Sequence, residues 1–175
     1  NALKLTIFDI SSRVIDHVER ARERAKKGTG PVIQLPREIG KQWPPDLAAY
    51  WRSLGDRIGT AVDPIHPPQT LEARAIAIRP DVVLALQPLA LNIVLQRLDL
   101  PDADRFDLIV GTNIFIYYGA MERSLALENA GAMLKRGGLL LTNDRLPEVA
   151  GGAMRQAGLT EVPYNRDAVG WYQKQ

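Results

Sequence analysis

The sequence predicts an α/β fold, with a mostly parallel sheet, helices on both faces of that sheet, and an antiparallel hairpin at the C-terminus. Two observations predict it. Short apolar segments typical of buried strands alternate with amphipathic segments of helical period, and such alternation gives right-handed crossovers between parallel strands. The last two apolar segments, 159–164 and 168–173, are joined only by Asn165-Arg166-Asp167, which predicts a hairpin.

The elements of the first half follow from apolar periodicity and from turn residues. Residues 3–9 are predicted as a strand, followed by a helix that Ser11 or Ser12 caps and that ends near Gly28. Residues 28–70 are predicted as an insertion that contains loops and one amphipathic helix. In chain order we expect that helix over 47–58, a proline-rich loop over 60–70, a strand over 71–78 and a short helix over 81–86.

The second half is assigned by the same criteria. In chain order we expect strands over 89–97, 107–110 and 139–142, a polar turn over 102–105, and helices over 120–136 and 147–157. Lys135 and Arg136 suit the C-terminal end of a helix, and Gly137 suits its left-handed cap. Gly158 is predicted to stop the last helix.

The composition fits one globular domain over 1–175. The 175 residues are 46% hydrophobic and 24% charged, and no apolar run approaches the roughly 18–20 residues that span a bilayer. A net charge of +2 gives no strong signal for nucleic acid. The absence of cysteine excludes disulfides, thiolate metal sites and a cysteine nucleophile, and it is compatible with a cytoplasmic location.

The predicted strand exits carry the candidate functional residues, because ligands bind at the carboxyl ends of the strands in an open parallel sheet. The exits are Asp9, Gln96-Arg97, Asn113 and Asn143-Asp144. Asp9 is placed either to accept hydrogen bonds from the ribose of a nucleotide cofactor or to cap the following helix. Tyr117 and Tyr118 are candidates for an acceptor pocket, or for packing under the next helix.

Other chemistries find no support in the sequence. The chain has two histidines, His17 and His66, and neither has a partner at metal-ligand spacing, so no metal site is predicted. Neither a Gly-x-Ser-x-Gly nucleophile elbow nor a phosphate-binding Gly-rich Lys-Ser/Thr loop occurs.

Four segments together resemble the class I S-adenosylmethionine-dependent methyltransferases. They are LTIFDIS, NIVLQRLDLP, FDLIVGTNIFIYY and MLKRGGLLLTND, which come in the order and spacing of that family from Leu3 to Asp144. The resemblance implies a Rossmann-like fold, S-adenosylmethionine as the cofactor and an unknown methyl acceptor. The third segment is loosely similar to the chemotaxis receptor methyltransferases, which carry an Asn and a Tyr at similar places.

The resemblance also implies a set of cofactor-binding residues. Asp9, with the adjacent Ile10, matches the acidic position that holds the ribose. Gln96, followed by Arg97, falls where the family often has an Asp that contacts the adenine, and this is a departure from the family pattern. Asn113 lies after the family's fourth strand, where cofactor and acceptor meet. No universal catalytic residue is implied, because methyl transfer depends on orientation and desolvation.

One family feature is missing from the sequence. The family's first strand and its glycine-rich loop come before the ribose-binding acid, but only eight residues precede Asp9 and none forms that loop. We therefore expect an N-terminally truncated domain that binds the cofactor poorly and is inactive as it stands. Flanking strands would keep unpaired edges, which predicts a rearranged sheet or a homodimer through these edges.

The favoured function is therefore methyl transfer by a fragment of such an enzyme. The first alternative is a non-catalytic methyltransferase-like scaffold or interaction domain, which the missing loop favours. A second alternative is another Rossmann-type enzyme such as a dehydrogenase, in which an acidic strand end also holds ribose. The asparagine after the fourth strand argues against the dehydrogenase.

Overall fold

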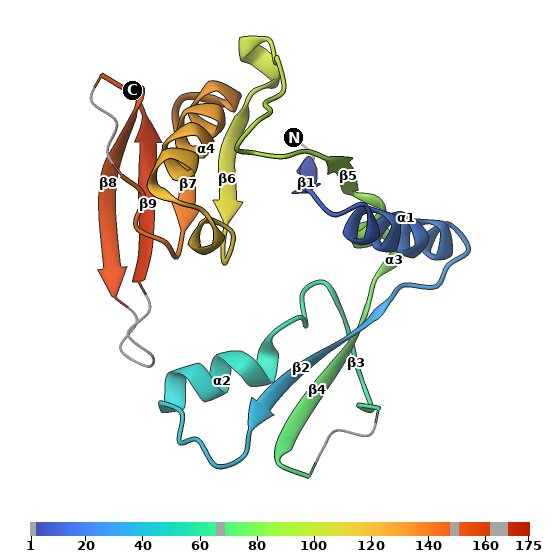
Figure 1. Cartoon of the computed structure of the whole chain (residues 1–175). Helices are drawn as coiled ribbons and strands as arrows, with labels where there is room; N and C mark the ends of the chain where they lie inside the picture. The colour runs from blue at the N-terminus through green and yellow to red at the C-terminus, as the bar shows by residue number, and fades with distance from the viewer. Residues whose placement is uncertain (1–2, 66–68, 148–150, 162–167) are drawn as a thin grey trace. The chain divides into compact units, whose positions relative to one another are not determined.

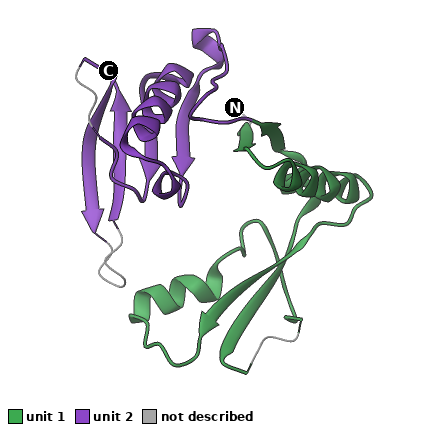
Figure 2. Cartoon of the chain, in the orientation of Figure 1, with its two compact units in different colours: residues 1–90 green, residues 91–175 purple. Residues whose placement is uncertain are grey.

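The computed structural model describes residues 3–65, 69–147, 151–161 and 168–175. It is a mixed α/β structure that contains both parallel and antiparallel strand pairs. The chain divides into two compact units, Asn1–Ala90 and Leu91–Gln175 (Figure 2), and each is described by itself. The single-domain assignment stays a prediction, since two compact units can belong to one domain.

The two ends of unit 1 together form a parallel strand pair with two helices. The first end contains β1 (Leu5–Asp9) and α1 (Ser12–Lys26), and the last end contains α3 (Pro80–Leu84) and β5 (Leu86–Ala90), as Figure 1 shows. β1 and β5 pair in parallel, with Leu5 opposite Leu86. Arg22 Nη1 of α1 donates a hydrogen bond of 2.8 Å to the carbonyl of Leu84. The predicted first strand and first helix are confirmed.

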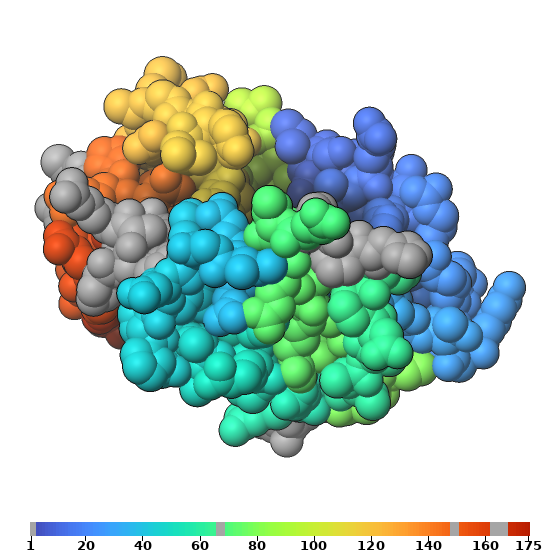
Figure 3. Space-filling view, turned by 90° about the horizontal axis from the view of Figure 1, so that it is seen from below, coloured from blue at the N-terminus to red at the C-terminus, as the bar shows by residue number. Residues whose placement is uncertain are grey.

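The segment of unit 1 between α1 and α3 contains an antiparallel sheet, which was not predicted from the sequence. β2 (Val32–Glu38), β4 (Leu71–Ile78) and β3 (Gly59–Val62) pair in that spatial order, and their surface is coloured light blue to green in Figure 3. The assignment of 28–70 to loops and one helix was therefore wrong for β2 and β3. Pro36 is compatible with this strand, because β2 pairs on one side only and an edge strand tolerates a proline.

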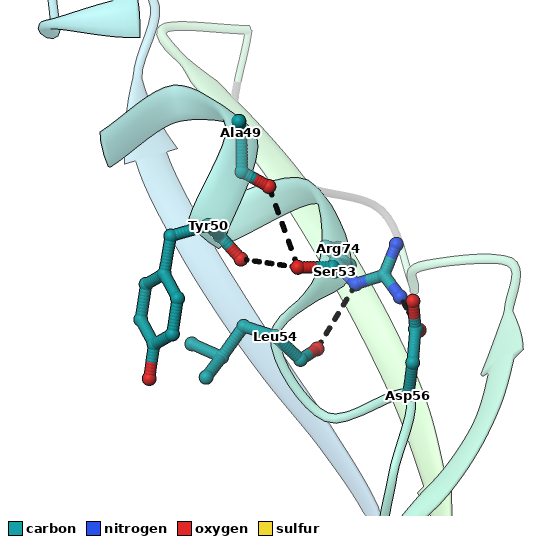
Figure 4. Close-up of polar contacts among 6 residues, drawn as sticks. All are labelled: Ala49, Tyr50, Ser53, Leu54, Asp56 and Arg74. Atoms are coloured by element: carbon teal, nitrogen blue, oxygen red, sulfur yellow. Dashed lines mark hydrogen bonds and ion pairs between the residues drawn. The ribbon is translucent and has the colours of Figure 1, made fainter. Parts of the chain in front are cut away.

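The helix of this segment is shorter than predicted. α2 spans Pro45–Ser53, and the hydroxyl of Ser53 donates to the carbonyls of Tyr50 and Ala49 at 3.1 and 3.4 Å (Figure 4). Arg74 of β4 donates from Nε to the carbonyl of Leu54 at 3.1 Å and forms an ion pair with Asp56. Arg74 thereby connects the C-terminal end of α2 to β4. The predicted extension of the helix to residue 58 is wrong, because the residues after Ser53 form a turn that makes these contacts and leads into β3.

Unit 2 is a four-stranded mixed sheet with a helix packed against it. Its elements are η1 (Asp102–Asp104), β6 (Phe106–Gly111), η2 (Phe115–Tyr117), α4 (Ala120–Met133), β7 (Leu134–Thr142), β8 (Met154–Glu161) and β9 (Ala168–Lys174). The spatial order is β6-β7-β9-β8, with β6 and β7 parallel and the remaining pairs antiparallel. Leu127, Leu134, Leu140 and Tyr172 lie in the core, each at most 1% exposed.

Several predicted boundaries in the second half are corrected. The predicted strand 89–97 is a strand only to Ala90, because residues 92–95 form a turn in which the N–H of Gln96 bonds the carbonyl of Asn92. The predicted helix 120–136 ends at Met133. Leu134 already lies opposite Phe106 in the β6–β7 ladder. Nζ of Lys174 in β9 donates to the carbonyl of Leu134 at 2.8 Å, and burial lowers the pKa of this lysine. Gly137 has the expected left-handed φ of 78°, but it lies within β7.

The C-terminal hairpin is confirmed, although it starts earlier than predicted. β8 and β9 are antiparallel, and the predicted turn at 165–167 lies outside the described residues. The predicted helix 147–157 is wrong from Met154 onward, because residues 154–161 pair with β9; residues 148–150 lie outside the described part. Gly158 does not stop a helix. It lies in β8, where the indole of Trp171 covers it.

The described strands form three sheets, which differs from the one mostly parallel sheet expected. The parallel ladders β1–β5 and β6–β7 each end on a strand with one neighbour, and the segment between α1 and α3 forms its own antiparallel sheet. None of the helices in the described part of the chain combines the length and apolar character needed to cross a membrane.

Candidate functional site

The exits of β6 and β7 lie side by side in unit 2. The two strands are parallel, with Gly111 opposite Thr142, so Asn113 and Asn143 follow at neighbouring exits. The backbone N–H of Asn113 donates to Oδ1 of Asn143 at 2.7 Å, and Nδ2 of Asn143 donates to Oδ1 of Asn113 at 2.7 Å. The two asparagines therefore link the loop after β6 to the loop after β7.

Asn113 has an unusual backbone conformation. Its φ is 57°, the one left-handed value at a non-glycine residue in the described ranges. Asparagine adopts this conformation more readily than most residues. Unusual backbone geometry of this kind occurs often at binding sites.

The loop after β6 is fixed by packing as well. Phe115 of η2 is 2% exposed and lies against Gly111, where an added Cβ would come within 2.8 Å of the ring. Arg123 of α4 donates from Nε to the carbonyl of Tyr118 at 2.8 Å, and from Nη1 to the carbonyl of Arg145 at 3.5 Å. The loop is therefore fixed by the packing of Phe115 on Gly111 and by the hydrogen bonds of Arg123.

The loop after β7 is held by a buried tyrosine of β9. The hydroxyl of Tyr172 accepts a hydrogen bond from the N–H of Leu146 at 2.8 Å, and it donates to the carbonyl of the same residue at 3.3 Å. Tyr172 is 1% exposed, so its hydroxyl is shielded from competing water. This contact fixes the backbone three residues after Asn143.

The two candidate tyrosines have different surroundings. Tyr118 is half-buried against the core of unit 2 and lines a shallow hollow together with Arg123, Arg145 and Leu146. Tyr117 is 81% exposed. Of the pair, Tyr118 therefore has the setting of a pocket residue, while Tyr117 presents its ring to solvent.

Asp144 adds an acceptor beside these loops. Its backbone N–H donates to Oγ1 of Thr142 at 3.0 Å, and its carboxylate Oδ2 is buried without a hydrogen-bond donor in the part of the chain that the structure describes. Asn143-Asp144 was predicted as a polar strand exit, but neither residue was given a role from the sequence. The signal that could have found them is that two strands of the predicted parallel sheet both end in polar residues.

Asp9 lies at the end of β1 in unit 1, as predicted. Its Oδ1 accepts a hydrogen bond of 2.7 Å from the N–H of Ser11, the residue before α1. One carboxylate oxygen thus supports the turn into the helix, and Oδ2 makes no hydrogen bond to the described residues. The adjacent Ile10 is 66% exposed.

Gln96 and Arg97 belong to unit 2 and follow a turn instead of ending a strand. Oε1 of Gln96 accepts a hydrogen bond of 2.9 Å from the N–H of Asn92, and both Gln96 and Arg97 are exposed. The amide nitrogen of Gln96 makes no hydrogen bond to the described residues. The described residues contain no group of three or more His, Cys, Asp or Glu side chains that could hold a metal ion.

No protein-family model matches the sequence, and no curated protein matches it. Similar solved structures include a TehB-like SAM-dependent methyltransferase from Corynebacterium glutamicum, with 16% identity and a TM-score of 0.40 over 52% of this chain and 58% of that one. The N-methyltransferase NodS from Bradyrhizobium japonicum is 14% identical, with a TM-score of 0.46 over 98% of this chain and 73% of that one.

A second structure of NodS contains S-adenosyl-L-homocysteine. It is 15% identical to this chain, with a TM-score of 0.45 over 98% of this chain and 66% of that one. This chain thus spans less than two thirds of two of these three structures.

Proposed function

We propose that this chain is part of a Rossmann-like, S-adenosylmethionine-dependent methyltransferase that acts on an unknown acceptor. The observation that carries the proposal is the place of Asp9, an acid at the carboxyl end of a parallel strand directly before a helix. The sequence resemblance assigns this position to the cofactor ribose. When bound, S-adenosylmethionine supplies an activated methyl group, and the protein supplies orientation and exclusion of water.

Each unit by itself holds a residue that fits one part of the cofactor. In unit 1, Oδ2 of Asp9, which has no donor among the described residues, is an acceptor for a ribose hydroxyl, while Oδ1 accepts from the N–H of Ser11. In unit 2, the amide nitrogen of Gln96, which has no acceptor among the described residues, is a donor for an adenine ring nitrogen, although the amide oxygen is already bonded to Asn92. We assign Ile10 and Arg97 to the same two roles by their adjacency.

The exits of β6 and β7 are the proposed acceptor side. Asn113 and Asn143 hold the two loops together, and Tyr118 lines the hollow beside them. Asn113 is proposed to orient either the acceptor or the amino acid end of the cofactor, because a displacement at a sulfonium needs an aligned nucleophile above all.

A second candidate function is a methyltransferase-like scaffold without catalysis. One observation favours it. Asp9 and Gln96 each already use one oxygen for a local backbone contact, which leaves less hydrogen-bonding capacity for a ligand. We therefore expect weak cofactor binding by this chain.

Calorimetry with S-adenosylmethionine tests the proposal and its alternative. Asp9→Asn keeps an oxygen that accepts from Ser11, but it removes the charge from the ribose contact, so we expect binding about tenfold or more weaker. Asp16→Asn in α1 is the matched control, since it makes the same charge change at an exposed helical position.

Each outcome of the calorimetry has a clear reading. Weak binding that Asp9→Asn reduces and Asp16→Asn leaves unchanged supports the methyltransferase proposal. A dissociation constant in the low micromolar range for the unmodified chain contradicts the expectation of weak binding. No detectable binding by any variant supports the scaffold.

A further inference from the structure

The hydrogen bonds between Asn113 and Asn143 fix the orientation of both side-chain amides. A backbone N–H can only donate, so the atom of Asn143 that faces the N–H of Asn113 must be Oδ1. The amide nitrogen of Asn143 then faces the side chain of Asn113. Since that nitrogen donates, the atom it meets must be Oδ1 of Asn113.

This arrangement leaves one polar group of Asn113 unused. Oδ1 is bonded to Asn143, whereas Nδ2 makes no hydrogen bond to the described residues. Asn113 is an exposed residue, so Nδ2 is accessible to a ligand at the exit of β6. The free group is therefore a donor with a fixed position.

A purely structural role does not require this pair. Glycine adopts a φ of 57° without steric cost, so the backbone conformation of Asn113 does not demand a carboxamide. The loop is also held independently, by Phe115 on Gly111 and by Arg123 on the carbonyl of Tyr118. The carboxamide pair adds something that these contacts do not, namely a defined direction for Nδ2.

We propose that Asn143 is a positioning residue that turns Nδ2 of Asn113 toward the ligand, so that this exit recognises a hydrogen-bond acceptor oxygen, a carboxylate or a carbonyl. The inference rests on the proposed function and names the ligand chemistry at its β6 exit. Such an oxygen has two sources, the amino acid end of the cofactor or the methyl acceptor itself. The geometry opposes a role in which Oδ1 of Asn113 accepts from an amine, because that lone-pair region is bonded to Asn143.

Two substitutions separate orientation from contact. Asn113→Asp keeps both hydrogen bonds of the pair, because only the backbone N–H and Oδ1 of residue 113 take part in them, but it removes the free donor. Asn143→Asp offers only acceptors, so the amide of Asn113 has to rotate, place Nδ2 on the introduced carboxylate and expose Oδ1. We expect this second variant to reverse the preference from acceptor ligands to donor ligands.

The measurement is an NMR titration of the full chain that follows the side-chain amide resonances of Asn113. The probes are S-adenosylhomocysteine, methylthioadenosine (which lacks the amino acid end), propionate and ethylammonium. We expect S-adenosylhomocysteine or propionate to shift these resonances and methylthioadenosine to leave them unchanged. A response of Asn113 to S-adenosylhomocysteine assigns the oxygen to the cofactor. A response of Asn113 to propionate, in a chain where S-adenosylhomocysteine shifts other resonances only, assigns it to the acceptor.

The variants complete the test. The variant Asn113→Asp has no side-chain amide, so its binding is followed by the backbone N–H resonance of residue 113. Where the unmodified chain responds, the apparent affinity for the responding probe should fall by at least about threefold to tenfold, because one hydrogen bond is lost and the new carboxylate repels an anionic probe. Asn143→Asp should make the Asn113 resonances respond to ethylammonium. Gln156→Glu, an amide-to-carboxylate change at an exposed position of β8, is the charge control and should change neither response.

Failure of the inference can be told from failure of the proposed function. If S-adenosylhomocysteine shifts resonances around Asp9 but no carboxylate probe shifts Asn113, the inference is wrong and cofactor binding stands. If propionate shifts Asn113 but S-adenosylhomocysteine shifts nothing, the inference stands and the proposed cofactor is wrong. Ethylammonium shifting Asn113 in the unmodified chain, or an unchanged preference in Asn143→Asp, overturns the inference.

Discussion

Gly158 lies at a tightly packed position in the sheet of unit 2. It lies in β8 opposite Trp171 of β9, and a Cβ added to it would come within 2.3 Å of the indole carbon Cζ2. Gly158→Ala therefore forces the indole or the strand to move. We expect the free energy of unfolding, measured by urea denaturation, to fall by about 1–3 kcal/mol, as for overpacked sites.

The control for this substitution is another glycine that has space around it. Gly40 has no heavy atom within 4 Å of an added Cβ and no positive φ, so Gly40→Ala should change stability by less than about 0.5 kcal/mol. Equal effects of the two substitutions would show that contact with Trp171 is not the cause. Near-ultraviolet circular dichroism should report the displaced indole in Gly158→Ala alone.

At the scale of elements, β2 is joined to α2 and its preceding loop through Arg37. The guanidinium of Arg37 lies 5.6 Å from the ring centre of Trp43 and 5.1 Å from that of Trp51, and it forms an ion pair with Glu72 of β4. Both rings attract the cation. We expect Arg37→Ala to lower the free energy of unfolding by about 1–3 kcal/mol and to change tryptophan fluorescence.

Glu72→Gln is the matched variant for this cluster. It removes the ion pair but leaves Arg37 over the two rings, and Glu72 is 47% exposed, so its loss should cost less than about 1 kcal/mol. If Glu72→Gln were as destabilising as Arg37→Ala, the aromatic contacts would contribute little. An unchanged fluorescence in Arg37→Ala would lead to the same reading.

The elements also show what the sequence could and could not predict. β1, α1, β4 and the C-terminal hairpin were predicted because their apolar patterns are complete in themselves. The β2 strand was missed because it contains Pro36 and mostly exposed side chains, so its sequence lacks the apolar pattern of a strand. Its partner, β4, lies over thirty residues away. The end of α4 was misplaced because Leu134 pairs with Phe106 of β6, a partner distant in sequence, and β7 therefore begins at Leu134.

For the whole molecule, predicting the site was limited in a similar way. The polar exits Asp9, Asn113 and Asn143 could be read from strand ends, because an apolar run that stops at a polar residue is a local signal. The reciprocal bonding of Asn113 and Asn143 could not, because it depends on β6 and β7 being parallel neighbours in one register. Roles therefore required the three-dimensional structure, although positions did not.

The last prediction concerns the assembly of the whole chain. β6 has one strand neighbour in the described residues, and its Leu108 and Val110 are 49% and 57% exposed. Because an unpaired strand edge with apolar side chains invites another strand, we expect the chain to self-associate in a concentration-dependent way in sedimentation velocity. Val110→Lys should shift it toward the monomer, since a charge on an edge strand opposes pairing. Val169→Lys is the control, because β9 has neighbours on both sides; an equal effect there would assign the change to charge alone, and a monomer at every concentration of the unmodified chain contradicts the prediction.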